Sequence, residues 1–177
     1  MRTILGLGLL AALAVAGCAS QRAEGPLFVS LGMSRGETAS ALRHYDFCAQ
    51  VEPAKNDEVY PQCDRPGTGY GDAWVIAHYD TGRLVRVQRF ERWTDDIRAA
   101  ERWNQLVEKR SAKQPVSPDA RARISARQSI PEGTKTWAAF QSGEDLVGVY
   151  LLAPPTAEGP SILEEILPGD APLGATP

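Results

Sequence analysis

Short segments rich in apolar, β-branched and aromatic side chains dominate the middle of the chain. Residues 72–79 and 84–90 are two such segments, and residues 80–83 between them read Asp-Thr-Gly-Arg, which is typical of a tight turn. Apolar and polar residues alternate along the second segment, so one side of the predicted hairpin should face solvent. The same alternation predicts a strand at residues 120–128, and two further segments between turns, residues 135–141 with Trp137 and Phe140 and residues 146–152, are also predicted to be strands.

Two other segments carry apolar residues at helical spacing, and each begins with a capping residue. Ser34 and Glu37 have the spacing of a capping box, which predicts a helix over residues 35–45. Thr94, followed by two acidic residues, predicts the start of a second, longer helix. Residues 47–71, between the first helix and the hairpin, are predicted to form a long loop. Helices and hairpins in this order predict an α+β fold, in which an antiparallel sheet of about five strands packs with two helices.

The two ends of the chain differ from its middle. Met1 and Arg2 precede an uncharged apolar run that reaches Ala16, and small residues then lead to Cys18. This run of about a dozen residues is shorter than the roughly 20 that span a membrane comfortably, and it is typical of a secretory signal. From Ala153 onward the chain is rich in proline, glycine and alanine, which predicts a flexible tail, although residues 161–167 within it have the capping-box spacing of two helical turns.

The sequence Val-Ala-Gly-Cys-Ala-Ser at residues 15–20 resembles the lipobox of bacterial lipoproteins. The resemblance implies that the signal is cleaved before Cys18 and that this cysteine carries the lipid. Because no aspartate follows Cys18, similarity to enterobacterial sorting favours the outer membrane, with the domain facing the periplasm. The expected organisation is a signal peptide over residues 1–17, a lipidated tether over 18–26, an α+β domain over 27–153 and a flexible tail over 154–177.

Cys48 and Cys63 remain as a pair if Cys18 carries lipid. An exported protein meets an oxidising compartment, so we expect these two cysteines to form a disulfide. A closed loop of about 15 residues would stabilise the fold by about 3 kcal/mol in the chain-entropy model. The alternative is a metal or redox site, for which the chain offers no CxxC motif and only His44 nearby.

A second resemblance covers residues 28–90. Residues 31–37 read Leu-Gly-Met-Ser-Arg-Gly-Glu and precede the first predicted helix and the hairpin with its Asp-Thr-Gly-Arg turn. This combination resembles the small outer-membrane lipoproteins of the BamE/SmpA type, which share a fold with β-lactamase inhibitor proteins. The chain departs from that family at residues 43–46, which read Arg-His-Tyr-Asp in place of Leu-Gly-x-Pro. The resemblance implies a binding or scaffolding lipoprotein that acts in outer-membrane assembly or integrity.

The ionisable residues argue against several other functions. The formal net charge of −3 provides no general attraction for nucleic acid. The two histidines, His44 and His78, lie in separate predicted elements, and no motif of a serine hydrolase or zinc protease occurs. Adjacent acids occur at predicted caps and turns, where they favour helix dipoles and solubility over general acid–base work. These pairs are Asp95/Asp96, Glu144/Asp145 and Glu164/Glu165. We therefore expect no enzyme, no metal site and no cofactor.

Arginines recur on two of the predicted strands. They are Arg83, Arg86 and Arg89 on one strand, and Arg121, Arg123 and Arg127 on another. If the two faces coincide, they would form a basic patch for lipid headgroups, peptidoglycan carboxylates or an acidic protein surface. The alternative interpretation is an ordinary solvated sheet face.

The favoured function is thus a membrane-anchored binding module whose partner is an outer-membrane protein, an assembly complex or peptidoglycan. The alternative is a periplasmic inhibitor or ligand-binding lipoprotein that uses the Cys48–Cys63 loop as its probe.

Overall fold

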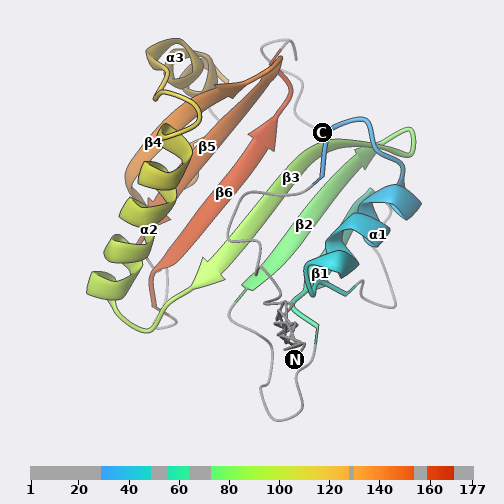
Figure 1. Ribbon diagram of the computed structural model, residues 1–177, viewed down its shortest axis with the longest axis horizontal. Coiled ribbons are helices and arrows are strands. Elements are labelled where there is room, and N and C mark those ends of the chain that lie inside the picture. The colour runs from blue at the N-terminus through green and yellow to red at the C-terminus, as the bar shows by residue number, and fades with distance from the viewer. Residues whose placement is uncertain (1–28, 49–55, 64–72, 128–129, 154–158, 170–177) are drawn as a thin grey trace, which may run out of the picture.

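The computed structural model describes residues 29–48, 56–63, 73–127, 130–153 and 159–169. Within these ranges the chain forms three helices and a six-stranded antiparallel sheet, so the predicted α+β class is confirmed (Figure 1). The helices are α1 (Arg35–His44), α2 (Asp96–Ser111) and α3 (Pro118–Ala126). The strands are β1 (Asp57–Pro61), β2 (Ala73–Asp80), β3 (Arg83–Arg92), β4 (Thr134–Ser142), β5 (Asp145–Leu152) and β6 (Ser161–Leu167).

The sheet consists of two three-stranded meanders that meet in its centre. The strand order is β1-β2-β3-β6-β5-β4, and every neighbouring pair is antiparallel. Each meander follows helical structure in the chain, and the last strands of the two meanders pair with each other. In this central pairing Gln88 lies opposite Glu165, and Arg89 lies opposite Glu164.

The helices are divided between the two faces of the sheet. Helices α1 and α2 cover one side, which we call the two-helix face, with α1 over the first meander and α2 over the second (Figure 1). Helix α3 packs on β4 and β5 from the opposite side, which we call the α3 face. The connection from α2 to α3 passes the outer edge of β4, where the Ser117 amide donates to the Ala139 carbonyl.

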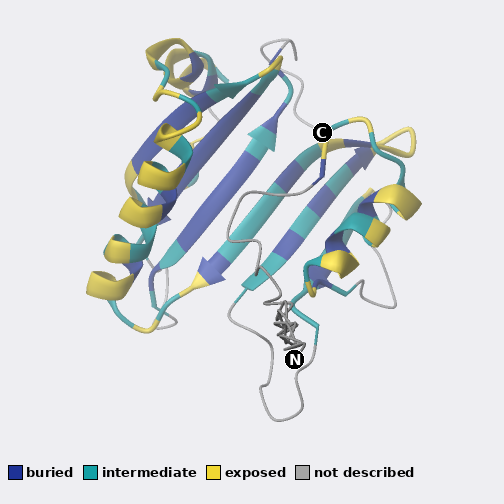
Figure 2. Ribbon diagram, viewed as in Figure 1, coloured by how far each residue is buried: buried dark blue, intermediate teal, exposed yellow. Residues whose placement is uncertain are grey.

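The two meanders therefore differ in how many of their faces are covered. Buried and half-buried residues alternate along β2, whereas β5 is buried almost continuously and β6 nearly so (Figure 2). Alternation is expected for a strand that buries one face, and continuous burial for a strand covered on both. The first meander thus leaves its α3 face only partly covered.

Residues 118–126 form a helix where the sequence pattern predicts a strand. The alternation of alanine and arginine fits a strand, but both residue types are strong helix formers. Pro118 occupies the first turn, and the Ser117 hydroxyl accepts from the Ala120 amide as an N-cap. The two buried residues, Ala120 and Ile124, are four positions apart and so share one side of the helix.

Residues 161–167 form the central strand β6, not part of a flexible tail. The sheet therefore extends beyond the expected domain limit at residue 153. Pairing with β3 on one side and β5 on the other satisfies the backbone of this short segment. Glu164 and Glu165 interrupt its apolar pattern, and their burial depends on partners elsewhere in the chain. Residues 170–177 of the expected tail lie outside the described residues.

Several local predictions are confirmed. The Ser34–Glu37 capping box begins α1 as expected. The two predicted hairpins are present as β2–β3 and β4–β5. In the first hairpin turn Thr81 and Gly82 both have positive φ, which suits the glycine there. Strand β1 lies within residues 47–71, for which the sequence pattern predicts a loop.

Candidate functional site

The partly covered α3 face of the first meander carries a row of apolar side chains. Register places Pro61, Trp74 and Phe90 side by side across β1, β2 and β3. Trp74 and Phe90 stack with their ring centroids 5.0 Å apart and their planes 6° from parallel. The Arg92 guanidinium lies 5.2 Å from the centre of the Trp74 ring. All three apolar residues of this row are half-buried.

A second row on the same face begins apolar and ends polar. Val59 and Ile76 are neighbours across β1 and β2, and Gln88 and Glu165 continue the row onto β3 and β6. Val59 and Ile76 are half-buried, whereas Glu165 is fully buried.

We call the part of the α3 face formed by β1, β2 and β3 the β1–β3 patch. Its residues are Asp57, Val59, Pro61, Trp74, Ile76, His78, Arg86, Gln88, Phe90 and Arg92.

Polar side chains at one end of the patch form a continuous chain of hydrogen bonds. His78 Nδ1 lies 2.8 Å from Asp57 Oδ1, and His78 Nε2 lies 3.0 Å from Gln88 Oε1. The Gln88 amide donates to Glu165 Oε1 at 2.9 Å, and Arg86 Nε donates to the same oxygen at 2.6 Å. The chain therefore connects residues of four strands, β1, β2, β3 and β6, and ends at one buried carboxylate.

The surroundings of Glu165 oppose its ionisation. Burial raises the pKa of this carboxyl, and the charge and hydrogen bonds of Arg86 and the amide of Gln88 offset only part of that effect. Its second oxygen, Oε2, has no hydrogen-bond partner among the described residues, and neither does the buried hydroxyl of Tyr150. Burial also raises the pKa of the Tyr150 hydroxyl, and the nearby Glu165 carboxylate raises it further. Gly148 lies opposite Glu165 in the register. Because glycine has no Cβ atom, the Tyr150 hydroxyl can lie directly against it.

A separate ionic network occupies the two-helix face of the same strands. Arg89 pairs with Glu91 and with Glu164, whose carboxylate lies 2.9 Å from Arg89 Nη1. From α2, Arg102 binds Glu91 through two nitrogens at 3.0 Å, and Arg110 lies 3.4 Å from Glu164. Each carboxylate of this network meets two arginines, which indicates a structural role in joining α2 to the centre of the sheet.

Glu164 and Glu165 thus point to opposite faces of the sheet, and each meets an arginine of β3. The sequence pattern alone predicts a turn or cap for this pair. Because neighbouring strand residues alternate between faces, the opposite orientation of the two glutamates follows once residues 161–167 are recognised as a strand.

The six candidate arginines do not form one patch. Arg86 lies on the α3 face and Arg89 on the two-helix face, while Arg83 donates to the Gly32 carbonyl at 3.2 Å. Of the remaining three, Arg121 and Arg123 lie on α3 and Arg127 is its C-cap residue, so none of them lies on a strand. Arg121 stacks over Trp137, and Arg123 and Arg127 donate to the backbone carbonyl of Gly169. Of the six, Arg86 alone belongs to the β1–β3 patch.

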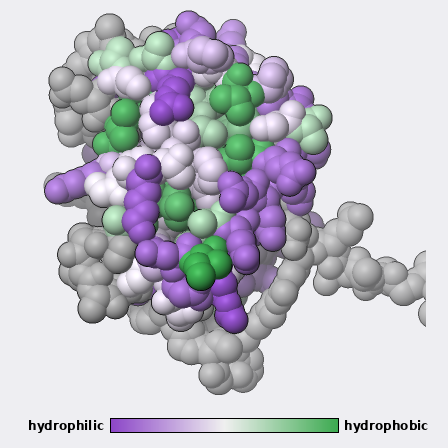
Figure 3. Space-filling view, turned by 90° about the vertical axis from the view of Figure 1, so that its left-hand side faces the viewer, coloured by the Kyte–Doolittle hydropathy of each residue, from purple (hydrophilic) through white to green (hydrophobic). Residues whose placement is uncertain are grey.

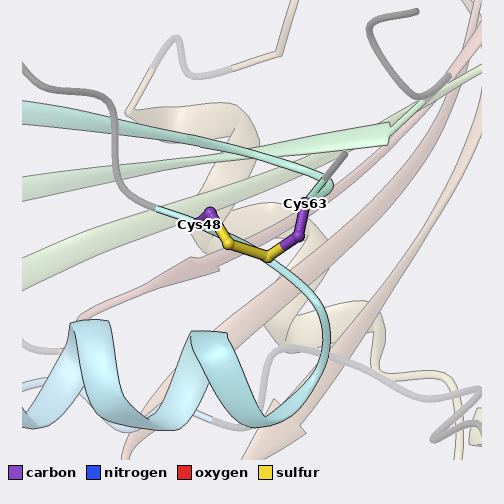
Figure 4. Close-up of a disulfide and its surroundings, with 2 residues drawn as sticks. All are labelled: Cys48 and Cys63. Atoms are coloured by element: carbon purple, nitrogen blue, oxygen red, sulfur yellow. A yellow bond between two sulfur atoms is a disulfide. The ribbon is translucent and has the colours of Figure 1, made fainter. Parts of the chain in front are cut away.

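Cys48 and Cys63 form the expected disulfide, beside the edge strand β1 (Figure 4). Two backbone hydrogen bonds reinforce the link, from the Cys48 amide to Pro61 and from the Cys63 amide to Asp46. The disulfide therefore ties the end of α1 to the end of β1. Residues 49–55 of the enclosed loop, like the candidate lipidation site Cys18, lie outside the described residues.

The side of the molecule that carries α2 and the β4 edge presents apolar side chains that are more scattered than those of the β1–β3 patch. Exposed apolar side chains on these elements and their connections are Ile97, Val116 and Ile130. Figure 3 shows the apolar residues on this side as separate spots with hydrophilic residues between them. A hollow of about 430 Å³ runs along α2 and is lined by residues of that helix and its C-cap.

The described residues include no group of three or more histidine, cysteine or acidic side chains placed to hold a metal ion. In the hydrogen-bonded chain both ring nitrogens of His78 are engaged, and Glu165 lies beneath Arg86 and Gln88.

Comparison of the chain with protein families, curated proteins and solved structures finds no match to any of them. No helix in the described part of the chain has the length and apolar character needed to cross a membrane.

Proposed function

We propose that this chain is a lipid-anchored protein of the cell envelope that binds an acidic surface of another envelope protein through the β1–β3 patch. The single observation that carries the proposal is the unequal covering of the two meanders. The second meander buries both of its faces, whereas the first leaves stacked aromatic rings half-buried on its α3 face.

The composition of the patch supports binding to a protein. Tryptophan, phenylalanine and arginine are enriched at the energetic centres of interfaces, where aromatic rings bury large areas with little loss of side-chain entropy. Trp74, Phe90 and Arg92 form such a group, and Val59 and Ile76 extend the apolar area beside it. A partner that covered these residues would remove their apolar side chains from water, as α3 does for the apolar side chains on the same face of the second meander.

The charges of the patch favour an acidic partner. Arg92 is exposed at the end of the patch that carries Trp74. At the other end, Asp57 faces His78 at 2.8 Å, and Glu165 is buried under Arg86. The charges presented to a partner are therefore mainly positive, and carboxylates opposite the arginines would add charge-assisted hydrogen bonds.

The anchoring part of the proposal rests on the lipobox resemblance at residues 15–20. A Cys18→Ala variant should fail to incorporate a clickable fatty acid in cells and should leave the membrane fraction. Incorporation of fatty acid into the variant would overturn the anchor without affecting the assignment of the binding surface.

Site-specific photocrosslinking tests the binding surface. A photoreactive amino acid at Ile76 should form an adduct in cells with one envelope protein, whereas the same probe at Ile97 should not. Ile97 is the matched control because it is an apolar residue that is 73% exposed and lies on α2, away from the patch.

A Trp74→Ala substitution should weaken this partner's binding by about 2 kcal/mol, or roughly thirtyfold in Kd. Equal adducts at both positions, or an unchanged Kd in the variant, would overturn the patch as the binding surface. An adduct with peptidoglycan instead of protein would overturn the proposed class of partner.

A second candidate function is inhibition or ligand binding through the Cys48–Cys63 loop. It is favoured by the disulfide and the two backbone hydrogen bonds, which hold both ends of the loop at the edge of the sheet. Replacing residues 49–55 with a glycine–serine linker of equal length distinguishes the two functions. Loss of partner binding with an unchanged unfolding midpoint would favour the loop, and retained binding would favour the patch.

A further inference from the structure

A single row of side chains crosses the whole α3 face of the sheet. The register places one apolar or aromatic residue from each strand side by side in this row. In order across the sheet they are Pro61, Trp74, Phe90, Leu163, Tyr150 and Trp137. The central pairing of β3 with β6 divides the row, so its first half belongs to the first meander and its second half to the second.

The two halves of the row are built in the same way. In the first half Trp74 and Phe90 stack, with their ring centroids 5.0 Å apart. In the second half Trp137 and Tyr150 stack, with their ring centroids 5.5 Å apart. Each meander therefore presents a flat aromatic pair at the same level of the sheet.

A guanidinium group lies over the tryptophan of each half. Arg121 lies 4.6 Å from the centre of the Trp137 ring, and Arg92 lies 5.2 Å from the centre of the Trp74 ring. The two arginines come from different places, because Arg121 belongs to the covering helix α3, whereas Arg92 ends β3 itself.

The halves differ in what covers them. Helix α3 packs Ala120 and Ile124 on the second half, where Leu163 is 1% exposed and Tyr150 fully buried. Among the described residues α3 is the helix on this face, and it packs on β4 and β5. The side chains of the first half remain half-buried (Figure 2).

The partly covered first half has the width of one helix. Neighbouring strands lie about 4.8 Å apart, so three strands present a surface about 10–14 Å wide. An α-helix with its side chains is about 10–12 Å across. Because α3 stands beside this surface on the same face of the sheet, a single helix fits next to it.

The charges beside this surface favour a helix that carries acidic residues. Arg86 and Arg92 both lie on the α3 face of β3, six positions and hence about 20 Å apart. The Arg86 side chain is 31% exposed above Glu165, and Arg92 is exposed. A helix lying along β3 spans that distance with about 13 residues, and carboxylates along one side of it would face both arginines.

We propose that the partner of the β1–β3 patch contributes an acidic, amphipathic α-helix, which packs on the first meander as α3 packs on the second. This inference rests on the function proposed above and specifies the element of the partner that is bound. The contact side of the helix should carry small or apolar residues four positions apart, as Ala120 and Ile124 are in α3, with aspartates or glutamates beside them.

Photocrosslinking from several positions of the patch tests whether the bound element is a helix. A photoreactive amino acid is placed in turn at Val59, Ile76 and Phe90, and mass spectrometry of the digested adducts locates the cross-linked partner residues. These residues should lie in one segment at spacings of three, four or seven, because such positions share one side of a helix. The same probe at Ile97 on α2 gives the background.

The other outcomes separate this inference from the proposed function. Cross-linked residues spaced by two, or scattered over several segments, would overturn the helix and leave the patch as the binding surface. Adducts no stronger than those from Ile97 would overturn the proposed function and the helix with it. Adducts with a second copy of this chain would also overturn both, because the occupant would then not be another envelope protein.

Charge reversal tests the acidic character of the helix. An Arg92→Glu substitution should raise the Kd of the partner about tenfold, and replacing the nearest acidic residue of the cross-linked segment with lysine should restore it. Arg98→Glu is the matched control, because Arg98 is an arginine of α2 whose side chain is 72% exposed, and its Kd should not change. An unchanged Kd in Arg92→Glu, or a loss that no lysine substitution restores, would overturn the acidic helix.

Discussion

Gly148 shows at the scale of one residue how tightly the α3 face is filled. A Cβ atom at this position would lie 2.4 Å from the Tyr150 hydroxyl oxygen, which is closer than real Cβ contacts allow. The Tyr150 ring is fully buried and stacks on Trp137, with ring centroids 5.5 Å apart, so it has little room to move aside.

A Gly148→Ala substitution should therefore destabilise the protein by about 1–3 kcal/mol. Urea unfolding followed by circular dichroism measures the change. Gly36→Ala is the control, because a Cβ atom at Gly36 in α1 would have no neighbour within 4 Å, and alanine favours helices. The control should be unchanged or slightly more stable. Equal losses in both variants would contradict the packing argument.

Two buried glutamates should respond to pH in opposite ways. For Glu165, burial raises the pKa above that of the unfolded chain, so the native state holds the proton more tightly. Its stabilising contribution is present at low pH and is lost as the pH rises through the native pKa. For Glu91, burial also acts to raise the pKa, but the hydrogen bonds and charges of Arg102 and Arg89 outweigh it and lower the pKa. Its contribution is present above the unfolded pKa of about 4.3 and is lost as the pH falls.

Glutamine variants measure this difference. Relative to the unmodified protein, Glu165→Gln should gain stability as the pH rises from about 4 to 8, and Glu91→Gln should be less stable near neutral pH, with a deficit that shrinks toward about pH 3. Urea unfolding at several pH values gives both curves. Parallel trends in the two variants would contradict the assigned environments.

Strand β6 shows at the scale of an element how a segment with an unremarkable sequence becomes the centre of a sheet. It is 7 residues long, pairs along both edges and sends Glu164 to the two-helix face. There the carboxylate is 2% exposed between Arg89 and Arg110. The pair of arginines joins β3 and α2 to β6, so the element depends on charges supplied from distant parts of the chain.

Removing the Glu164 charge should leave Arg110 buried without its carboxylate and should leave Arg89 with Glu91 alone. We expect Glu164→Gln to destabilise the protein by about 3–5 kcal/mol, the range found when one member of a buried pair is removed. Asp96→Asn provides the comparison, since the Asp96–Lys135 pair is solvent-exposed and should contribute less than about 1 kcal/mol. A loss in Glu164→Gln no larger than in this control would show that the buried network contributes little.

At the scale of the whole molecule, the disulfide and the unequal covering of the sheet have separate consequences. The disulfide links cysteines 15 positions apart, between α1 and β1, at one edge of the sheet. It does not touch the central strands or the network around Glu164, so its loss should lower stability without changing the sheet.

A Cys48→Ser/Cys63→Ser variant should unfold with a free energy lower by about 3 kcal/mol, from the entropy that the closed loop removes from the unfolded state. Urea unfolding measures the loss, and reduction of the unmodified protein should reproduce it. The far-ultraviolet circular dichroism of the folded variant should be unchanged. A folded variant that lacks the β-sheet signal would instead make the link essential to the sheet.

Local features could be predicted from the sequence because their causes are local. The α1 cap depends on Ser34 and Glu37 within a single turn, and each hairpin depends on two segments joined by a short turn. The cysteine pair followed from their number and from the expected compartment. These features needed no knowledge of which parts of the chain meet.

The tertiary structure decided the rest, because those outcomes depend on distant partners. Alternating alanine and arginine in residues 118–126 fits a strand or a helix, and docking of Ala120 and Ile124 on the second meander selects the helix. Residues 161–167 become a strand because they pair with β3 along one edge and with β5 along the other. Arginines of β3 on the two faces of the sheet meet the two glutamates of this strand. The β1–β3 patch likewise exists because α3 precedes the second meander and covers that half of the sheet alone. An amino-acid pattern reports which side of a segment is apolar, but what covers that side is decided by the packing of the whole fold.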